Sequence, residues 1–258
     1  MNDKDRLQPV VVAGIGQLGG VFSTGFLKAG YPVYPATPEK PLSALAGRIP
    51  DPVLVLLAVP ENVLAEAIRQ VPHIWRDRLG LLQNELLPHV WKSEGIASPT
   101  AMAVWFEKKP GREFTVFQPT QIFGPAAETV RDALTALDIA CEILPDAQQL
   151  MLELVKKSLY VLTINIAGIS VGGTTGALWT NHRSLAEAVA HDVLTVMEHL
   201  TGNALDRRDM IKFLETILLK VPDHSCRGRV AEDRLARILK IARKAGIPTP
   251  ALDKIAGI

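Results

Sequence analysis

Residues that build disulfides, metal sites and strongly charged surfaces are scarce in this chain. Of its 258 residues only Cys141 and Cys226 are cysteine, and neither they nor the six histidines have the spacing of a metal-binding motif. With 28 basic and 27 acidic residues the formal net charge is +1, which gives no electrostatic basis for binding nucleic acid or an anionic membrane. We therefore expect no metal site and no nucleic-acid or membrane partner.

Long apolar segments are missing too. The longest run, residues 159–171, is too short to span a bilayer and is interrupted by Thr163 and Asn165. Residues 1–6 are polar and lack the apolar segment of a signal peptide, so we expect a cytoplasmic protein. A hydrophobic content of 48% over this length predicts a sizeable core, in two domains or one large one.

A glycine-rich turn follows the first apolar segment of the chain. Residues 10–13 predict a buried strand, and glycines at three fixed positions then allow a tight turn, the close approach of a pyrophosphate and helix packing against the strand. A helix over 18–29 and a second strand from 32 favour a dinucleotide site over an empty strand-to-helix turn. The residues expected to contact the cofactor here are Gly14, Ile15, Gly16, Gln17, Leu18 and Gly19.

The end of the second strand predicts which dinucleotide binds. An acidic residue that would hold the ribose hydroxyls of NAD is missing near Ala36, and Glu39 comes slightly late. Thr37 and Lys40 could instead donate to a 2′-phosphate, which favours NADP. The alternative is that residues 37–40 form an ordinary solvated turn before a helix.

Strand and helix patterns alternate up to residue 145 and become helical afterwards. This order predicts an α/β dinucleotide-binding domain over 1–146 and a helical substrate and dimerisation domain over 147–258. The expected strands lie near 9–14, 32–36, 53–59, 79–83, 102–107, 114–118 and 140–144. The expected helices lie near 18–29, 61–70, 126–137, 147–171, 184–201, 207–218 and 230–245.

Two further segments lie where such a sheet places its ligands, beyond the carboxyl ends of strands. Ala58, Val59 and Pro60 end the third strand and would face the cofactor. Gln83 and Asn84 end the fourth, where two amides can either bind a ligand or form a turn.

Several of these motifs, taken in order, resemble ketopantoate reductase. They are the glycine turn, Gln83-Asn84, Lys157 followed by Asn165, and the segments 228–233 and 246–250. The resemblance spans nearly the whole chain. It implies a Rossmann-type domain joined to an all-α domain as in 6-phosphogluconate dehydrogenase, an active site in the cleft between them, and a homodimer. It also implies NADPH-dependent reduction of a small 2-oxo acid.

The resemblance also implies roles for individual residues. Lys157 would be the general acid that polarises the carbonyl group, and Glu232 would accept a hydrogen bond from a substrate hydroxyl. Asn84 and Asn165 would contact substrate or cofactor, and Ser225 would lie near the cleft, with a turn or helix cap as its alternative role.

Helical spacing supports Lys157 independently. Val161, Ile164 and Gly168 share its helix face, so the ammonium group should be partly desolvated, which would lower its pKa and make it a better proton donor. Lys156, on the neighbouring face, is the competing candidate.

Departures from the family pattern widen the choice of function. Val161 stands where the family usually has an asparagine, residues 58–60 lack its usual lysine, and the segment 225–228 looks shortened. We therefore expect a divergent relative. A 3-hydroxyacid dehydrogenase, an imine reductase and an NADP-binding regulator without turnover remain as alternatives.

Overall fold

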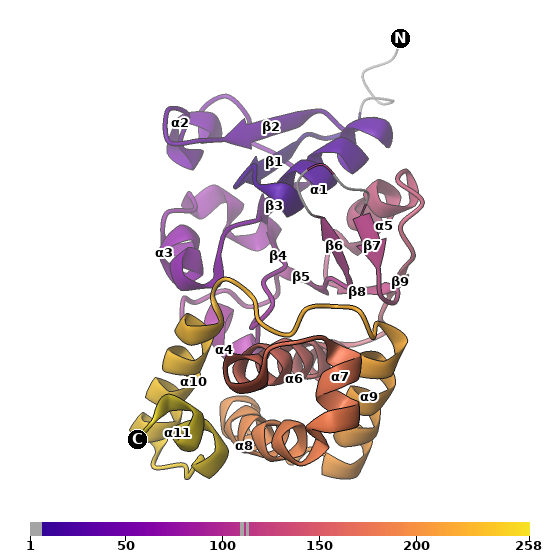
Figure 1. The fold of residues 1–258 in the computed structure, drawn as a ribbon. Coiled ribbons are helices and arrows are strands. Elements are labelled where there is room, and N and C mark those ends of the chain that lie inside the picture. The colour runs from indigo at the N-terminus through magenta and orange to yellow at the C-terminus, as the bar shows by residue number, and fades with distance from the viewer. Residues whose placement is uncertain (1–6, 109–110, 112–113) are drawn as a thin grey trace. The chain divides into compact units, whose positions relative to one another are not determined.

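The chain forms two compact units, Met1–Leu154 and Val155–Ile258 (Figure 1). The structure is a computed structural model that describes residues 7–108, 111 and 114–258. The first unit is built on a mostly parallel sheet and the second is helical. Helix α6 (Ala147–Val171) begins where the second domain was expected to begin, and the division between the units falls inside it.

The main sheet of the first unit has the strand order β2-β1-β3-β4-β5-β8-β9. Strands β1 to β5 pair in parallel, β8 runs antiparallel to β5, and β9 runs parallel to β8. The strands are β1 (Val10–Ala13), β2 (Val33–Ala36), β3 (Leu54–Leu57), β4 (Leu79–Leu81), β5 (Thr100–Ala103), β8 (Thr120–Phe123) and β9 (Cys141–Ile143). A separate antiparallel pair consists of β6 (Phe106–Lys108) and β7 (Phe114–Val116).

The direction of strand addition reverses at β1, which lies between β2 and β3. A doubly wound sheet binds its ligand beyond the carboxyl ends of the strands at such a point. Strands β1 and β3 are buried on both faces, as their uninterrupted apolar sequences predict. Helix α1 (Gln17–Lys28) packs Phe22 and Phe26 into the same core as Val130 of α5 (Ala127–Thr135). Among the described residues of this unit, the remaining helices are α2 (Leu42–Ala46), α3 (Leu64–Arg69), α4 (Pro88–Lys92) and the 3-10 segments Glu61–Val63 and His73–Arg78.

The expectation of one strand over 102–107 is wrong, and β8 was not expected. The apolar run ends one strand, β5, and begins another, β6, which pairs with β7 in a different sheet. Trp105, between them, donates its backbone N–H to the side chain of Thr120 at 3.2 Å. An uninterrupted apolar sequence cannot reveal that the chain changes sheets in the middle of it.

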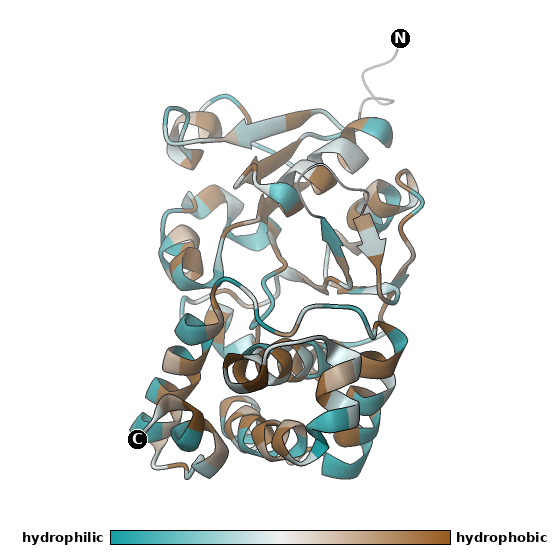
Figure 2. Cartoon of the chain, viewed as in Figure 1, coloured by the Kyte–Doolittle hydropathy of each residue, from teal (hydrophilic) through white to brown (hydrophobic). Residues whose placement is uncertain are grey.

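The second unit is built of helices. Helix α6 has the length and composition to cross a membrane, but 78% of its most apolar window is buried inside the protein, as in a core helix. Figure 2 shows both brown and teal stretches on α10, whose buried positions recur with helical spacing. The helices are α7 (Thr175–Asn181), α8 (Arg183–Thr201), α9 (Arg207–Lys220), α10 (Ala231–Ala245) and α11 (Pro250–Ala256). The short helices α7 and α11 were not expected.

Candidate functional site

The three glycines of the turn after β1 occupy three different environments. Gly14 has a φ of +92°, and a Cβ there would collide with the carbonyl oxygen of Ala58. A Cβ at Gly19 would collide with the carbonyl oxygen of Gly14, which lets α1 pack directly on the turn. A Cβ at Gly16 would meet nothing within 4 Å. The first and third glycines are therefore required by the fold, and the second leaves open space for a ligand.

Gly16 is also the N-cap of α1, and no side chain caps this end of the helix. The first backbone N–H groups, beginning with Gln17 and Leu18, thus have no acceptor within the helix and lie at its positive dipole end. Backbone N–H groups in this arrangement bind phosphate. The turn has the geometry that the pyrophosphate of a dinucleotide requires.

The loop after β3 lies directly against this turn. Ala13 pairs in register with Leu57, and the N–H of Ala58 donates to the carbonyl oxygen of Ala13 at 2.8 Å. Val59 and Pro60 follow in the same loop, with Pro60 at the N-cap of the 3-10 segment. The structure therefore brings together two of the segments predicted to contact the cofactor.

The side chain of Gln83, at the end of β4, forms hydrogen bonds with this loop. Its buried Nε2 donates to the carbonyl oxygens of Leu57 at 2.6 Å and Val59 at 3.1 Å, and its Oε1 accepts from the N–H of Leu82 at 3.1 Å. Of the two roles open to this amide, the structure therefore supports shaping the loop rather than contacting a ligand.

Asn84 is half-buried beside the same loop, and Glu61 positions its backbone. The Oε1 of Glu61 accepts a hydrogen bond from the N–H of Asn84 at 3.0 Å. Sequence reasoning missed Glu61, whose partner lies 23 residues away.

Thr37 follows β2 at the same edge of the sheet, since Ala36 pairs in register with Ala13. The backbones of Thr37 and Lys40 exchange two hydrogen bonds, at 3.0 and 3.1 Å, and the Lys40 N–H also reaches the Thr37 hydroxyl at 3.3 Å. A hydrogen bond from Thr37 holds the pKa of the Glu39 carboxyl below its usual value. The four residues form a tight turn that groups a hydroxyl, a carboxylate and a lysine.

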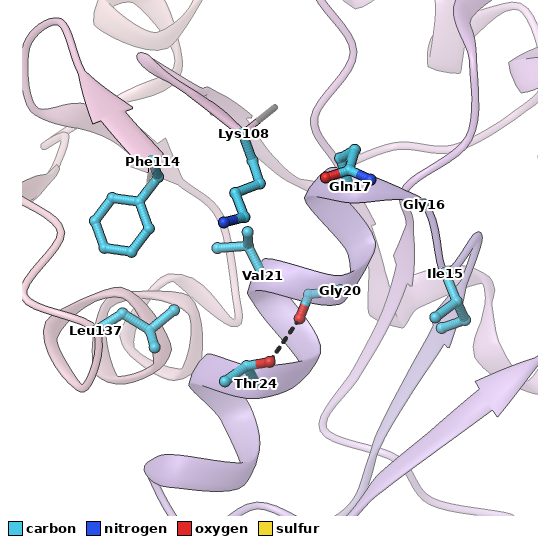
Figure 3. A pocket seen from close by; sticks show the side chains of 9 residues that line it. All are labelled: Ile15, Gly16, Gln17, Gly20, Val21, Thr24, Lys108, Phe114 and Leu137. Atoms are coloured by element: carbon cyan, nitrogen blue, oxygen red, sulfur yellow. Dashed lines mark hydrogen bonds between the residues drawn. The ribbon is translucent and has the colours of Figure 1, made fainter. Parts of the chain in front are cut away.

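A cavity of about 480 Å³ runs along α1 from its N-terminus (Figure 3). Lys108, from β6, extends toward Val21 on the helix, and the ring of Phe114, from β7, points toward Leu137 on another side. Ile15, Gly16 and Gln17 line the end of the cavity near the glycine turn. The three lining residues outside α1 and the turn were not found from the sequence.

In the second unit, Lys157 and Lys156 have different surroundings. Lys157 is 6% exposed, and its Nζ lies 5.9 Å from the centroid of the Tyr160 ring. Val161, on the same helix face, is buried as expected. Lys156 is only half-buried, and its Nζ lies 5.4 Å from the ring centroid of Phe213 on α9.

Tyr160 links α6 to the segment between α9 and α10. Its hydroxyl forms a 2.7 Å hydrogen bond with Nδ1 of His224, and the two rings are stacked with centroids 6.0 Å apart. Ser225, the next residue, is exposed and forms a backbone bridge with Thr174. Neither Tyr160 nor His224 was found from the sequence.

Asn165 is 5% exposed on α6, and its Oδ1 accepts a 2.9 Å hydrogen bond from Nη1 of Arg234 on α10. Arg234 is itself 6% exposed. Sequence reasoning missed this residue because it lies 69 positions from its partner.

Glu232 lies in the first turn of α10 and is exposed. Its own backbone N–H, and then the ion pair with Arg227, keep the pKa of its carboxyl below the usual value. It lines a groove of about 610 Å³ whose wall also includes Ile169, Leu235 and Ile255. The structure thus places Glu232 in a solvated environment, unlike Lys157 and Asn165.

Cys226 is completely buried, and this burial raises the pKa of its thiol to about 11. It is therefore not a thiolate at neutral pH. Among the described residues, no group of three or more histidine, cysteine, aspartate or glutamate side chains could hold a metal ion.

No protein-family model and no curated protein matches the sequence. Solved structures match almost its whole length. A 2-dehydropantoate 2-reductase from Methylococcus capsulatus has a TM-score of 0.67 and 14% identity, over 96% of this chain and 94% of that one. D-mandelate dehydrogenase with NADH and anilino(oxo)acetate has a TM-score of 0.65 and 13% identity, over 96% of each chain. The dimeric ketopantoate reductase from Staphylococcus aureus has a TM-score of 0.62 and 18% identity, over 96% of this chain and 95% of that one. This chain therefore has the fold of ketopantoate reductases and D-mandelate dehydrogenase.

Proposed function

We propose that this protein is an NADPH-dependent reductase of a small 2-oxo acid, similar to ketopantoate reductase. The observation that carries the proposal is a buried lysine, Lys157, on helix α6 of a chain with this fold, eight residues before a buried asparagine, Asn165. An ammonium group in such surroundings can stabilise a developing oxyanion and deliver a proton to it.

The residues divide into two groups. Gly16 and the N–H groups of Gln17 and Leu18 would hold the pyrophosphate, with Gly14 and Gly19 shaping the turn. Ile15, Thr37, Asn84 and the loop from Ala58 through Val59 to Pro60 would complete the cofactor site. When bound, NADPH would supply a hydride to the carbonyl carbon of the substrate.

On the substrate side, Lys157 would donate the proton that converts the carbonyl oxygen to a hydroxyl. Asn165 and Asn84 would bind the substrate, and Ser225 would lie near it. Glu232 would accept a hydrogen bond from a substrate hydroxyl, a role that its exposed carboxylate can perform without losing its charge.

A substrate panel tests the proposal. The purified protein, with NADPH, is offered aliphatic and aryl 2-oxo acids, 3-oxo acids and cyclic imines, and NADPH oxidation is followed by absorbance. We expect turnover with a 2-oxo acid. Preference for a 3-oxo acid or an imine would assign the protein to a related class of reductase. NADPH binding without turnover on any of them would instead favour a regulator.

The choice of NADP rests on the turn after β2. Thr37 and Lys40 can donate to a 2′-phosphate, whereas the Glu39 carboxylate beside Thr37 would repel it. We expect fluorescence titration to show tighter binding of NADPH than of NADH. Lys40→Ala should weaken the binding of NADPH and leave that of NADH unchanged. Equal or reversed affinities would contradict the assignment.

A cytoplasmic homodimer that associates through the helical unit is part of the same proposal. The dimeric state named for the Staphylococcus aureus enzyme, which shares the fold, supports the assembly.

A further inference from the structure

A buried arginine occupies a core position of α10. The helix otherwise buries small or apolar residues with helical spacing, such as Ala231, Leu235, Ile238 and Ala242. Arg234 shares this face and is only 6% exposed. Burying a guanidinium group carries a large desolvation cost, and such departures from a helix's own pattern are typical of functional positions.

One partner of this arginine is the side chain of Asn165, whose Oδ1 accepts a hydrogen bond from Nη1 at 2.9 Å. A guanidinium group has only hydrogen-bond donors, so the amide must present its oxygen to Arg234 and direct Nδ2 elsewhere. Within the part of the chain that the structure describes, Asn165 Nδ2 has no hydrogen-bond acceptor. Arg234 thus fixes a buried amide in the orientation in which it can only donate to a further group.

Two glycines keep this amide in a narrow space. A Cβ at Gly228 would lie 2.6 Å from Asn165 Oδ1, and a Cβ at Gly168 would lie 2.8 Å from the backbone nitrogen of Arg227. The segment 226–228 therefore lies directly on α6 at the level of Asn165. A side chain at either glycine would disturb this contact, and the hydrogen bond from Arg234 holds the amide in one orientation.

We propose that Arg234 is a positioning residue, which orients Asn165 so that Nδ2 donates to the carboxylate of the substrate and whose buried charge favours an anionic substrate over a neutral one. The inference rests on the proposed function, in which Asn165 contacts a 2-oxo acid. It also explains how this chain could hold an acidic substrate with Val161 where the family has a second amide.

Three variants separate positioning from a structural role. Arg234→Met removes the charge and fills a similar volume, Arg234→Lys keeps a charge, and Asn165→Asp keeps an acceptor for Arg234 but removes the donor. Arg208→Met, at an exposed position of α9, is the control for loss of an arginine elsewhere in the helical unit. Each is assayed with the best 2-oxo acid of the panel and with the corresponding 2-oxo amide, alongside NADPH titration and thermal melting.

We expect Arg234→Met to raise KM for the acid by about tenfold or more, to reduce the preference for acid over amide, and to leave NADPH affinity unchanged. Arg234→Lys should recover part of this preference. Asn165→Asp should melt at or above the wild-type temperature, because it pairs with Arg234, and yet lose most of its activity. The double variant Arg234→Met with Asn165→Ala should have a KM for the acid no higher than that of Asn165→Ala alone, because both changes remove the same interaction.

Failure of the proposed function and failure of the role of Arg234 give different results. If the wild type reduces a 2-oxo acid and Arg234→Met keeps its KM and its acid preference, the role of Arg234 is overturned while the function stands. If Arg234→Met does not fold, Asn165→Asp decides, and normal activity in that variant overturns the inference. A wild type that reduces no substrate overturns the proposed function and, with it, the role of Arg234 toward a substrate.

Discussion

Lys157 and Lys156 are adjacent in sequence, but only Lys157 is buried. If Lys157 stabilises the oxyanion and delivers the proton, Lys157→Ala should lower kcat by about 100-fold or more and leave NADPH affinity nearly intact. Lys157→Met, which leaves no cavity, should do the same. Lys156→Ala should have far less effect. Steady-state kinetics with a melting curve for each variant test this, and an inactive Lys156→Ala beside an active Lys157→Ala would reverse the assignment.

The glycine turn allows a test in which ligand binding is separated from folding. A methyl group at Gly16 meets no protein atom within 4 Å, so Gly16→Ala should fold normally and weaken NADPH binding by about tenfold or more. Gly20→Ala, one turn into α1 and equally open, should bind NADPH normally and be more stable by about 0.5–1 kcal/mol. Fluorescence titration and urea unfolding measure the two effects. Equal NADPH affinity in both variants would contradict the role of Gly16.

At the residue scale, conformation and burial could be predicted only where they depend on local sequence. The glycine turn was predictable because each glycine acts within a few residues of the others, and the burial of Lys157 followed from the apolar residues on its helix face. Gln83 and Arg234 form their hydrogen bonds with residues 26 and 69 positions away. Only the folded chain brings such pairs together, so neither partner could be predicted.

At the scale of elements, a buried carboxylate joins α8 to the start of α11. The Oδ2 of Asp192 accepts hydrogen bonds from the N–H groups of Ala251 at 2.7 Å and Leu252 at 3.1 Å. Asp192→Ala leaves both donors without this acceptor and should lower the free energy of unfolding by about 1–3 kcal/mol. Asp192→Asn retains an oxygen at the same position, so its free energy of unfolding should fall much less. Urea unfolding of the wild type and the two variants measures both effects. Equal losses in the two variants would show that the carboxylate does not cap α11.

The same residue predicts a pH dependence of stability. Burial raises the pKa of the Asp192 carboxyl, although the two backbone N–H groups act in the opposite direction. The folded protein therefore binds this proton more tightly than the unfolded chain, and the contribution of Asp192 to stability falls as pH rises between its unfolded and folded pKa values. Relative to Asp192→Asn, the wild type should thus lose stability from acidic to neutral pH. A difference that does not change with pH would contradict this.

The long elements could be predicted from the sequence, and the short ones could not. Helices α6, α8, α9 and α10 lie within a few residues of their predicted limits, because each buries a long periodic face. Strand β8 is held by antiparallel pairing with β5, a contact between distant segments. The seven-residue helices α7 and α11 are too short to show a period, so their stability depends on packing such as the contact with Asp192.

At the scale of the whole molecule, the fold is shared with enzymes that are only 13–18% identical. Sequences this different can share a fold when they keep the same pattern of buried apolar and exposed polar positions. This pattern, rather than the identity of each residue, determines the core. Substrate choice depends on a few side chains on that fold. Under the proposed function, we expect Val161 and Arg234 to be among the side chains that determine this choice.

Assembly is the last prediction at this scale. The groove between α10 and α11, which Glu232 lines at the start of α10, is otherwise mainly apolar. A second copy of the chain could cover the part formed by Leu239, Ile255 and Ile258 and leave Glu232 open. Light scattering at micromolar concentration should give twice the mass of one chain. Ala236→Glu places a charge at an exposed position of the groove and should shift the protein toward the monomer without lowering its melting temperature. Val63→Glu, at a residue of the first unit that is 43% exposed, should leave the dimer intact. A monomeric wild type would contradict dimerisation, and a dimeric Ala236→Glu would show that the copies associate through another surface.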